Sequence, residues 1–412
     1  MKKITVYSIL FLSMFFILTC EKNDSLMKEP VFIQLNEKSK SLLTSTNSFG
    51  IDLFRTLISP AKTIGENAMV SPLSISLALA MTYNGANGDT KTAIQNTLRL
   101  NDLTVDEINI NFKQVSEALL SVDNQVDFSI ANSIWYRNTF SVFQDFIDVN
   151  HDFYNAEVNA LDFDNPNSIN LINSWVANHT NNKIDKIVET IPAETVMFLI
   201  NAIYFQGIWK YEFDASKNIT HTFTLSDGSS ISKEMMVQTT NLKYLSANNF
   251  QMVEMPYGAG NWAMDLLLPA PSKNVDQIIN GLTNSSWDSL VHALSDPIEV
   301  TVSIPPFKFE YESDLNNVLT NMGMGIAFNE NTADFSKINN DYQLYISKVK
   351  HKTFIEVDER GTEAAAVTSV EVGTTSSGIE RNIVFSKPFL FVIREISTGV
   401  ILFIGKVENP TR

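Results

Sequence analysis

The first half of the chain places its hydrophobic residues at helical spacing. Phe49, Leu53 and Leu57 recur every four residues, so they share one helical face and predict a helix from Asn47 to Ile58. The same spacing predicts further helices at residues 170–178, 275–282 and 314–322.

A second helix is predicted where Ser71 precedes Pro72. A serine side chain caps a helix N-terminus well, and proline fits the first helical position. The apolar run that follows extends this helix to Tyr83, and Asn84-Gly85 ends it.

The second half is dominated by short apolar or β-branched runs, which predict strands. These runs cover residues 196–205, 264–268, 298–304, 354–357, 383–393 and 400–407. Helices that come early and strands that come late favour a mixed α+β fold over a regular parallel α/β sheet. No linker rich in Pro, Gly or Ser interrupts residues 44–412, which we therefore interpret as one domain.

The first residues resemble an export signal and not part of the fold. Lys2 and Lys3 precede an uncharged, mainly apolar run at residues 4–18, which is short for a transmembrane helix and ends near Cys20. The sequence Ile-Leu-Thr-Cys at residues 17–20 resembles a bacterial lipobox. We predict a lipoprotein signal peptide at residues 1–19, and a lipidated Cys20 with a tether at residues 20–43. The alternative is an ordinary signal peptide in which Cys20 is incidental.

Composition narrows the classes of partner. The chain has 412 residues, of which 46 are Asp or Glu and 30 are Lys or Arg, so the formal net charge is -16. An acidic protein is a poor partner for phosphate backbones, which excludes nucleic-acid binding. Cys20 is the only cysteine, so no disulfide framework is expected and membrane contact is predicted through the lipid alone.

Signatures of catalysis are missing from the sequence. It contains no G-x-S-x-G elbow, no Walker A loop and no H-E-x-x-H pair. The histidines do not pair at metal-ligand spacing; they are His151, His179, His221, His292 and His351. We therefore predict no catalytic residue, no metal and no cofactor, although a Ser/His/Asp triad need not be visible in sequence.

Residues 359–378 combine the features of a loop and of a strand. Taken in steps of two, one face is small and uncharged throughout; it consists of Thr362, Ala364, Ala366, Thr368, Val370 and Val372. The other face carries both glutamates, Glu363 and Glu371. Such a strand is able to bury one face in a narrow space between packed strands, while Gly, Thr and Ser on its flanks suit an exposed loop. The segment alone is equally compatible with a loop that does not change conformation.

Five segments, in one order along the chain, identify the sequence as similar to the serpin family. The first is Glu359 to Thr368, which resembles the hinge of an inhibitory serpin's reactive loop. The other four are Asn-Ala-Met-Val-Ser-Pro-Leu-Ser-Ile at residues 67–75, Asn-Ala-Ile-Tyr-Phe-Gln-Gly-Ile-Trp at 201–209, Val-Phe-Ser-Lys-Pro-Phe-Leu-Phe at 384–391, and Phe-Ile-Gly-Lys-Val-Glu-Asn-Pro at 403–410. The resemblance covers essentially the whole body of the chain and implies a large central sheet, additional sheets, about eight or nine helices and an exposed reactive loop.

The resemblance also implies site residues. The hinge consists of Glu359, Gly361, Thr362, Glu363, Ala364, Ala365, Ala366, Val367 and Thr368. The shutter, where the central strands part, consists of Ser71, Ser74, Asn201 and His351, and Trp209 marks the breach, where the loop first inserts. Three positions depart from common family residues, namely Asn182, Gln206 and Ala366.

The implied activity is inhibition of proteases by a suicide mechanism that needs a metastable monomer. Counting from the hinge places the reactive bond at Thr375-Ser376, and counting back from Pro388 places it at Ser377-Gly378; Thr374 and Ser377 are the alternatives. Between Gly361 and Glu380 there is no Lys, Arg, Phe, Tyr, Trp, Leu or Met, which favours elastase-like or subtilisin-like targets, with papain-like cysteine proteases second.

Three other function classes compete with this interpretation. One is a non-inhibitory serpin that acts as a surface binding module, and the next is an adhesive or ligand-capturing lipoprotein. A hydrolase is the third. We expect the protein outside the cytoplasm, lipid-anchored to a bacterial envelope, with target proteases as covalent partners.

Overall fold

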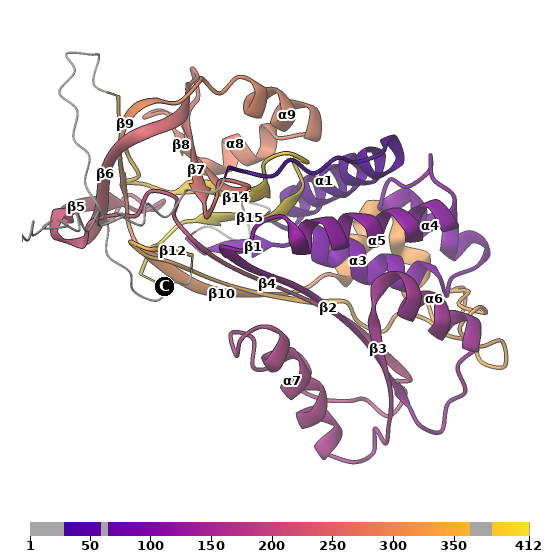
Figure 1. The fold of residues 1–412 in the computed structure, drawn as a ribbon. Coiled ribbons are helices and arrows are strands. Elements are labelled where there is room, and N and C mark those ends of the chain that lie inside the picture. The colour runs from indigo at the N-terminus through magenta and orange to yellow at the C-terminus, as the bar shows by residue number, and fades with distance from the viewer. Residues whose placement is uncertain (1–28, 59–64, 363–380, 412) are drawn as a thin grey trace, which may run out of the picture.

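The structure is a computed structural model, and it describes residues 29–58, 65–362 and 381–411 (Figure 1). In these ranges the elements up to residue 208 are α1 Glu37–Leu57, β1 Ala68–Val70, α3 Pro72–Tyr83, α4 Gly88–Thr97, α5 Val105–Ser121, β2 Val126–Arg137, α6 Gln144–Tyr154, β3 Ala156–Leu161, α7 Asn167–His179 and β4 Met197–Ile208. They are followed by β5 Ile219–Thr224, β6 Ser230–Ser246, β7 Phe250–Tyr257, β8 Trp262–Pro269, α8 Val275–Gly281, α9 Asn284–His292, β9 Ile298–Ile304, β10 Phe307–Asp314 and α10 Asn316–Leu319. The last strands are β11 Lys350–Val357, β12 Gly361–Thr362, β13 Asn382–Val384, β14 Phe389–Glu395 and β15 Ile401–Val407.

These strands form two sheets. A six-stranded sheet has the order β10-β11-β12-β4-β2-β3, and a nine-stranded sheet has the order β1-β15-β14-β8-β7-β6-β9-β13, with β5 added to β6. Nine α-helices are present among the described residues. Figure 1 shows α7 alone on one face of the six-stranded sheet, with α1, α3, α4 and α5 on the opposite side. The α+β architecture predicted from the sequence is confirmed.

Two hydrophobic clusters hold this arrangement together. The larger joins the two sheets to α1, α3 and α5 through residues such as Phe54, Leu77 and Phe112. The smaller joins α7 to β2 and β4 through Ile172 and Ile200 among others. Because α7 is attached to the sheet by this small cluster, it forms a separate layer over the strands β2 and β4.

Several predicted elements match closely. Ser71 caps α3 by accepting a hydrogen bond from the backbone N–H of Ser74, and Pro72 occupies the first helical position. The strand predicted at residues 298–304 is β9 without change. These elements were predictable because their signals are local.

The folded body begins earlier than residue 44, so the tether expected to reach residue 43 is too long. Helix α1 starts at Glu37, and Asn36 caps it by accepting from the N–H of Ser39. Within the expected tether, Ser39, Leu42 and Leu43 are buried. Polar residues at buried positions concealed the helical spacing; Ser39 is one of them, and its hydroxyl donates to Oδ1 of Asn111 at 2.7 Å.

Two other predictions were wrong in detail. The run at residues 383–393 is divided between β13, which pairs with β9, and β14, which pairs with β8 and β15. Pro388 stands between them, and proline cannot donate to a ladder. The helix predicted at 314–322 begins two residues late, at Asn316, and runs as α10 into a π-helical segment, Thr320–Met324, in which Gly323 departs from helical backbone with φ 110°.

Candidate functional site

Strand β12 lies between β4 and β11 and pairs with both. Thr362 stands opposite Val357 of β11 and Gly207 of β4, and Gly361 stands opposite Ile208. A Cβ on Gly361 would lie 2.1 Å from the carbonyl oxygen of Gly207, and its φ is 154°, so only glycine fits. The first part of the predicted hinge is therefore already a strand of the six-stranded sheet. Hinge residues 363–368 lie outside the described residues.

Trp209 fixes the backbone that leads into β12. Its backbone N–H donates to the carbonyl of Arg360 at 2.7 Å, and its indole Nε1 donates to the carbonyl of Asp358 at 3.0 Å. Glu359 is held in the same way, because its carbonyl accepts from the N–H of Phe213 and its Oε1 accepts from Nδ2 of Asn218, at 2.8 and 2.7 Å. The structure thus places the predicted breach residue directly beside the hinge.

Tyr257, which no sequence motif singles out, completes this end of the site. Its ring stacks on that of Trp209 with centroids 4.3 Å apart, and its hydroxyl lies 2.6 Å from Oγ1 of Thr362. Burial raises the pKa of the Tyr257 hydroxyl well above its ordinary value, so it remains a neutral hydrogen-bonding group. The signal was hidden because Tyr257 belongs to β7 of the other sheet, 105 residues from Thr362.

Beyond β12, an open cavity of about 810 Å³, which we call the slot, lies along the two flanking strands. Residues 197–203 of β4 and 350–353 of β11 line its sides. Among the described residues, β4 and β11 are connected through β12 and share no ladder of their own. The slot therefore continues the line of β12 through the sheet.

All four predicted shutter residues line the slot, and three of them form one hydrogen-bonded group. The backbone N–H of Ser71 donates to Nε2 of His351 at 3.0 Å, and Oγ of Ser71 accepts from the N–H of Ser74 at 3.3 Å. Asn201 bonds elsewhere, because its Nδ2 donates to Oδ1 of Asn132 at 2.8 Å. Asn132 was not predicted, since only the pairing of β2 with β4 brings it opposite Asn201.

His351 is held in its neutral form. Burial lowers its pKa to about 4, and its Nε2 must be unprotonated to accept from Ser71. Ser71 presents its backbone N–H and not its hydroxyl to the imidazole, so the pair lacks the geometry of a serine nucleophile and its base. The cluster therefore stabilises the packing of the strands and lacks the arrangement needed for covalent chemistry.

The remaining predicted residues cannot be placed. The reactive-bond candidates Thr374, Thr375, Ser376 and Ser377 lie outside the described residues, as does Cys20. In the described ranges, no three His, Cys, Asp or Glu side chains come together as a metal site would require. None of the helices in these ranges has both the length and the apolar character needed to span a bilayer.

Comparisons with known proteins agree with this geometry. A family model described as serpin (serine protease inhibitor) matches residues 44–410. Serpin B11 of Homo sapiens is 33% identical over 395 residues, which cover 90% of this chain and all of that protein. An uncharacterized serpin-like protein of Methanosarcina acetivorans is 34% identical over 90% of this chain and 86% of its own length. Among solved structures, the thermophilic serpin tengpin in its native state superposes with a TM-score of 0.82 at 33% identity, over 93% of this chain and 98% of tengpin.

Proposed function

The chain belongs to the serpin family, and from this membership we propose that it is a suicide inhibitor of serine proteases. The observation that carries the proposal is the position of β12. The hinge has begun to pair with both strands that flank an open slot, and the chain that follows it is small enough on one face to continue.

In the proposed mechanism, the target's serine hydroxyl attacks the carbonyl carbon of Thr375. The bond to the nitrogen of Ser376 breaks, that nitrogen leaves as an amine, and Thr375 becomes an ester of the protease. The freed hinge then extends β12 down the slot before water hydrolyses the ester. Loop insertion of this kind is the established mode of action of the family.

The two ends of the slot support such an insertion. Thr362 faces the core beside Tyr257, so every second residue after it would also face the core. Those residues begin with Ala364, Ala366 and Thr368, which are small and uncharged. At the far end, the hydrogen bonds of Ser71 with His351 and of Asn201 with Asn132 join residues that line the slot, and we propose that the strand displaces them.

The loop sequence supports targets with a shallow specificity pocket. Thr, Ser, Val and Gly dominate residues 367–378, which favours elastase-like or subtilisin-like proteases, with papain-like cysteine proteases as the second class. The leader and Cys20 support a lipid-anchored protein outside the cytoplasm of a bacterial cell. Its partners are then proteases that reach the envelope.

The test mixes the unlipidated form, residues 21–412, with pancreatic elastase and follows the mixture by denaturing gels and mass spectrometry. We expect an SDS-resistant complex together with a C-terminal peptide that begins at Ser376. Complete cleavage with no complex, for elastase, subtilisin and papain alike, would contradict the proposal and favour a non-inhibitory binding module.

A further inference from the structure

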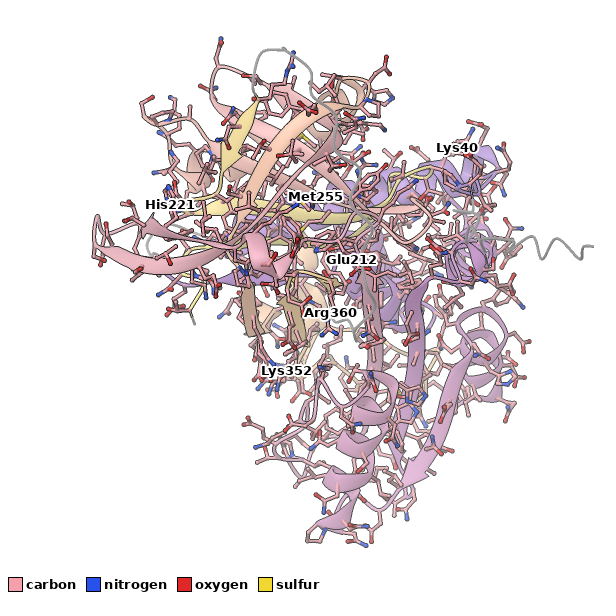
Figure 2. All side chains as sticks on the ribbon, turned by 60° about the vertical axis from the view of Figure 1, so that its left-hand side comes forward. Lys40, Glu212, His221, Met255, Lys352 and Arg360 are labelled. Carbon is pink, nitrogen blue, oxygen red and sulfur yellow. The ribbon has the colours of Figure 1, made fainter. Side chains whose placement is uncertain are left out.

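The two edges of the six-stranded sheet are protected to different degrees. The edge strand β10 carries Lys308, Glu310 and Glu312, and the ammonium of Lys352 in β11 contacts Glu310 at 3.0 Å. Figure 2 labels this lysine. The opposite edge strand, β3, has the sequence Ala-Glu-Val-Asn-Ala-Leu and carries a single charge. Charged side chains along an edge oppose the pairing of a further strand, so β3 marks the less protected edge.

Beside β3 lies an open cavity of about 750 Å³, which we call the edge groove. It is flanked by α6, which leads into β3 through Asn155, and by α7, the helix that follows β3. Figure 1 shows β3 at the margin of the sheet between these two helices. The side chains that give the edge groove its chemistry are Asp148 of α6, Glu157 of β3, and Trp175 and His179 of α7.

The main chain of two strands forms part of the edge groove. Residues 130–132 of β2 and 156–158 of β3 all line it, although successive side chains of a strand point to opposite faces of the sheet. Consecutive residues share one cavity when that cavity borders the edge of the strand. Within the described part of the chain, β3 pairs with β2 alone, and it begins opposite Asn132, so Ile130 and Ala131 have no strand on that side. The strands thus present main-chain groups that no strand of the described chain pairs.

The edge groove carries negative charge. Asp148 accepts from Nε2 of Gln144 at 2.7 Å, and Oε1 of Glu157 lies 3.6 Å from Nε2 of His179. Nδ1 of His179 donates to the carbonyl of Trp175 at 2.8 Å, so in the neutral ring Nε2 has no proton to share with Glu157. No Lys or Arg of the described residues lines the groove. A segment that complements these carboxylates is therefore basic.

Trp175 adds an unused hydrogen-bond donor to the wall. The residue is 8% exposed, its ring centroid lies 4.2 Å from that of His179, and its Nε1 has no hydrogen-bond partner among the described residues. A buried donor without a partner is unfavourable, and a main-chain carbonyl is a suitable acceptor for it. An extended peptide supplies such carbonyls at regular spacing, which a small cation does not.

We propose that the edge groove binds an extended, basic segment of a partner protein. The main chain of this segment hydrogen-bonds to the strand edge that borders the groove, and its Lys or Arg side chains contact Asp148 and Glu157. A second copy of this chain is a poor partner, because its formal net charge is -16. The proposal requires neither the hinge nor a protease, so it goes beyond the proposed function.

Calorimetric titration with synthetic peptides tests this binding. The probe is an acetylated and amidated heptapeptide of alternating Lys and Val. Two control peptides keep this sequence but are N-methylated on the amides of all Val or of all Lys residues. Each is titrated into the unlipidated chain, residues 21–412, into Glu157→Lys and Asp148→Lys, and into the matched control Glu330→Lys, an exposed glutamate outside the groove. Urea unfolding first establishes that every variant is folded.

We expect the probe to bind the unmodified chain and Glu330→Lys alike, and to bind Glu157→Lys and Asp148→Lys about ten-fold more weakly. One of the two N-methylated peptides should also bind about ten-fold more weakly, because only alternate amides of a strand face its neighbour. Equal weakening by all three substitutions would overturn the proposal, since the attraction would then be to the acidic chain in general. Equal binding of the probe and both N-methylated peptides would overturn the strand pairing. Absence of binding to the unmodified chain at millimolar peptide would also overturn the proposal and leave the proposed function unaffected.

Discussion

The two ends of the slot are built in different ways. At the end next to β12, which we call the upper end, backbone pairing on both sides of β12 is combined with the stacked rings of Trp209 and Tyr257. At the far end, which we call the lower end, the wall of the slot carries the hydrogen bond between the Ser71 N–H and His351. If the hinge inserts as proposed, its strand would extend the pairing at the upper end and would have to break the hydrogen bonds at the lower end.

The largest effect on complex formation is expected from a charge introduced at the upper end of the slot. Thr362→Arg puts a guanidinium at a position that is 4% exposed and faces Tyr257, where an unpaired charge is strongly unfavourable. We expect the hinge to leave the sheet and the SDS-resistant complex to be lost, while cleavage of the loop continues. The control is Thr362→Val, which keeps the shape and should still form the complex. A normal yield of complex from Thr362→Arg would show that β12 is not where insertion begins.

The lower end is expected to respond to pH. The pKa of His351 is about 4 in the folded chain and about 6.5 when exposed, so the folded state binds fewer protons between these values. Its contribution to stability is complete above pH 6.5 and is lost as pH falls towards 4, which amounts to about 3 kcal/mol.

Urea unfolding at pH 7.5 and pH 4.5 measures this loss, with His351→Gln as the control. Glutamine keeps an acceptor for the Ser71 N–H but does not titrate in this range. The native chain should lose more stability than the variant between the two pH values. Equal losses of stability in the two proteins would mean that protonation of His351 does not destabilise the folded chain.

The two ends also differ in how many of their residues can be predicted from the sequence. Ser71, Trp209 and the hinge lie within segments whose resemblance to a family is continuous, and His351 was selected from the resemblance as a whole, so all of them could be predicted without a structure. Tyr257 and Asn218 could not, because each contacts the hinge from an element that only the folded chain brings beside it. The early start of α1 was missed for a related reason, since the partner that makes buried Ser39 acceptable is 72 residues away.

The smallest effect is expected from the hydroxyl of Tyr257, which links Thr362 of the hinge to the second sheet. Tyr257→Phe removes the hydrogen bond to Thr362 but keeps the ring that stacks on Trp209, so the loss should be about 1 kcal/mol. Hydrogen exchange at the backbone amide of Thr362 should rise by about five-fold, because β12 opens more often while the rest of the sheet is unchanged. Tyr244→Phe is the matched control, since it loses a hydrogen bond from Gln251 at a place away from the slot. Faster exchange across the whole of β4 and β11 would instead mean that Tyr257 stabilises the entire sheet, and the two ends of the slot would no longer be independent.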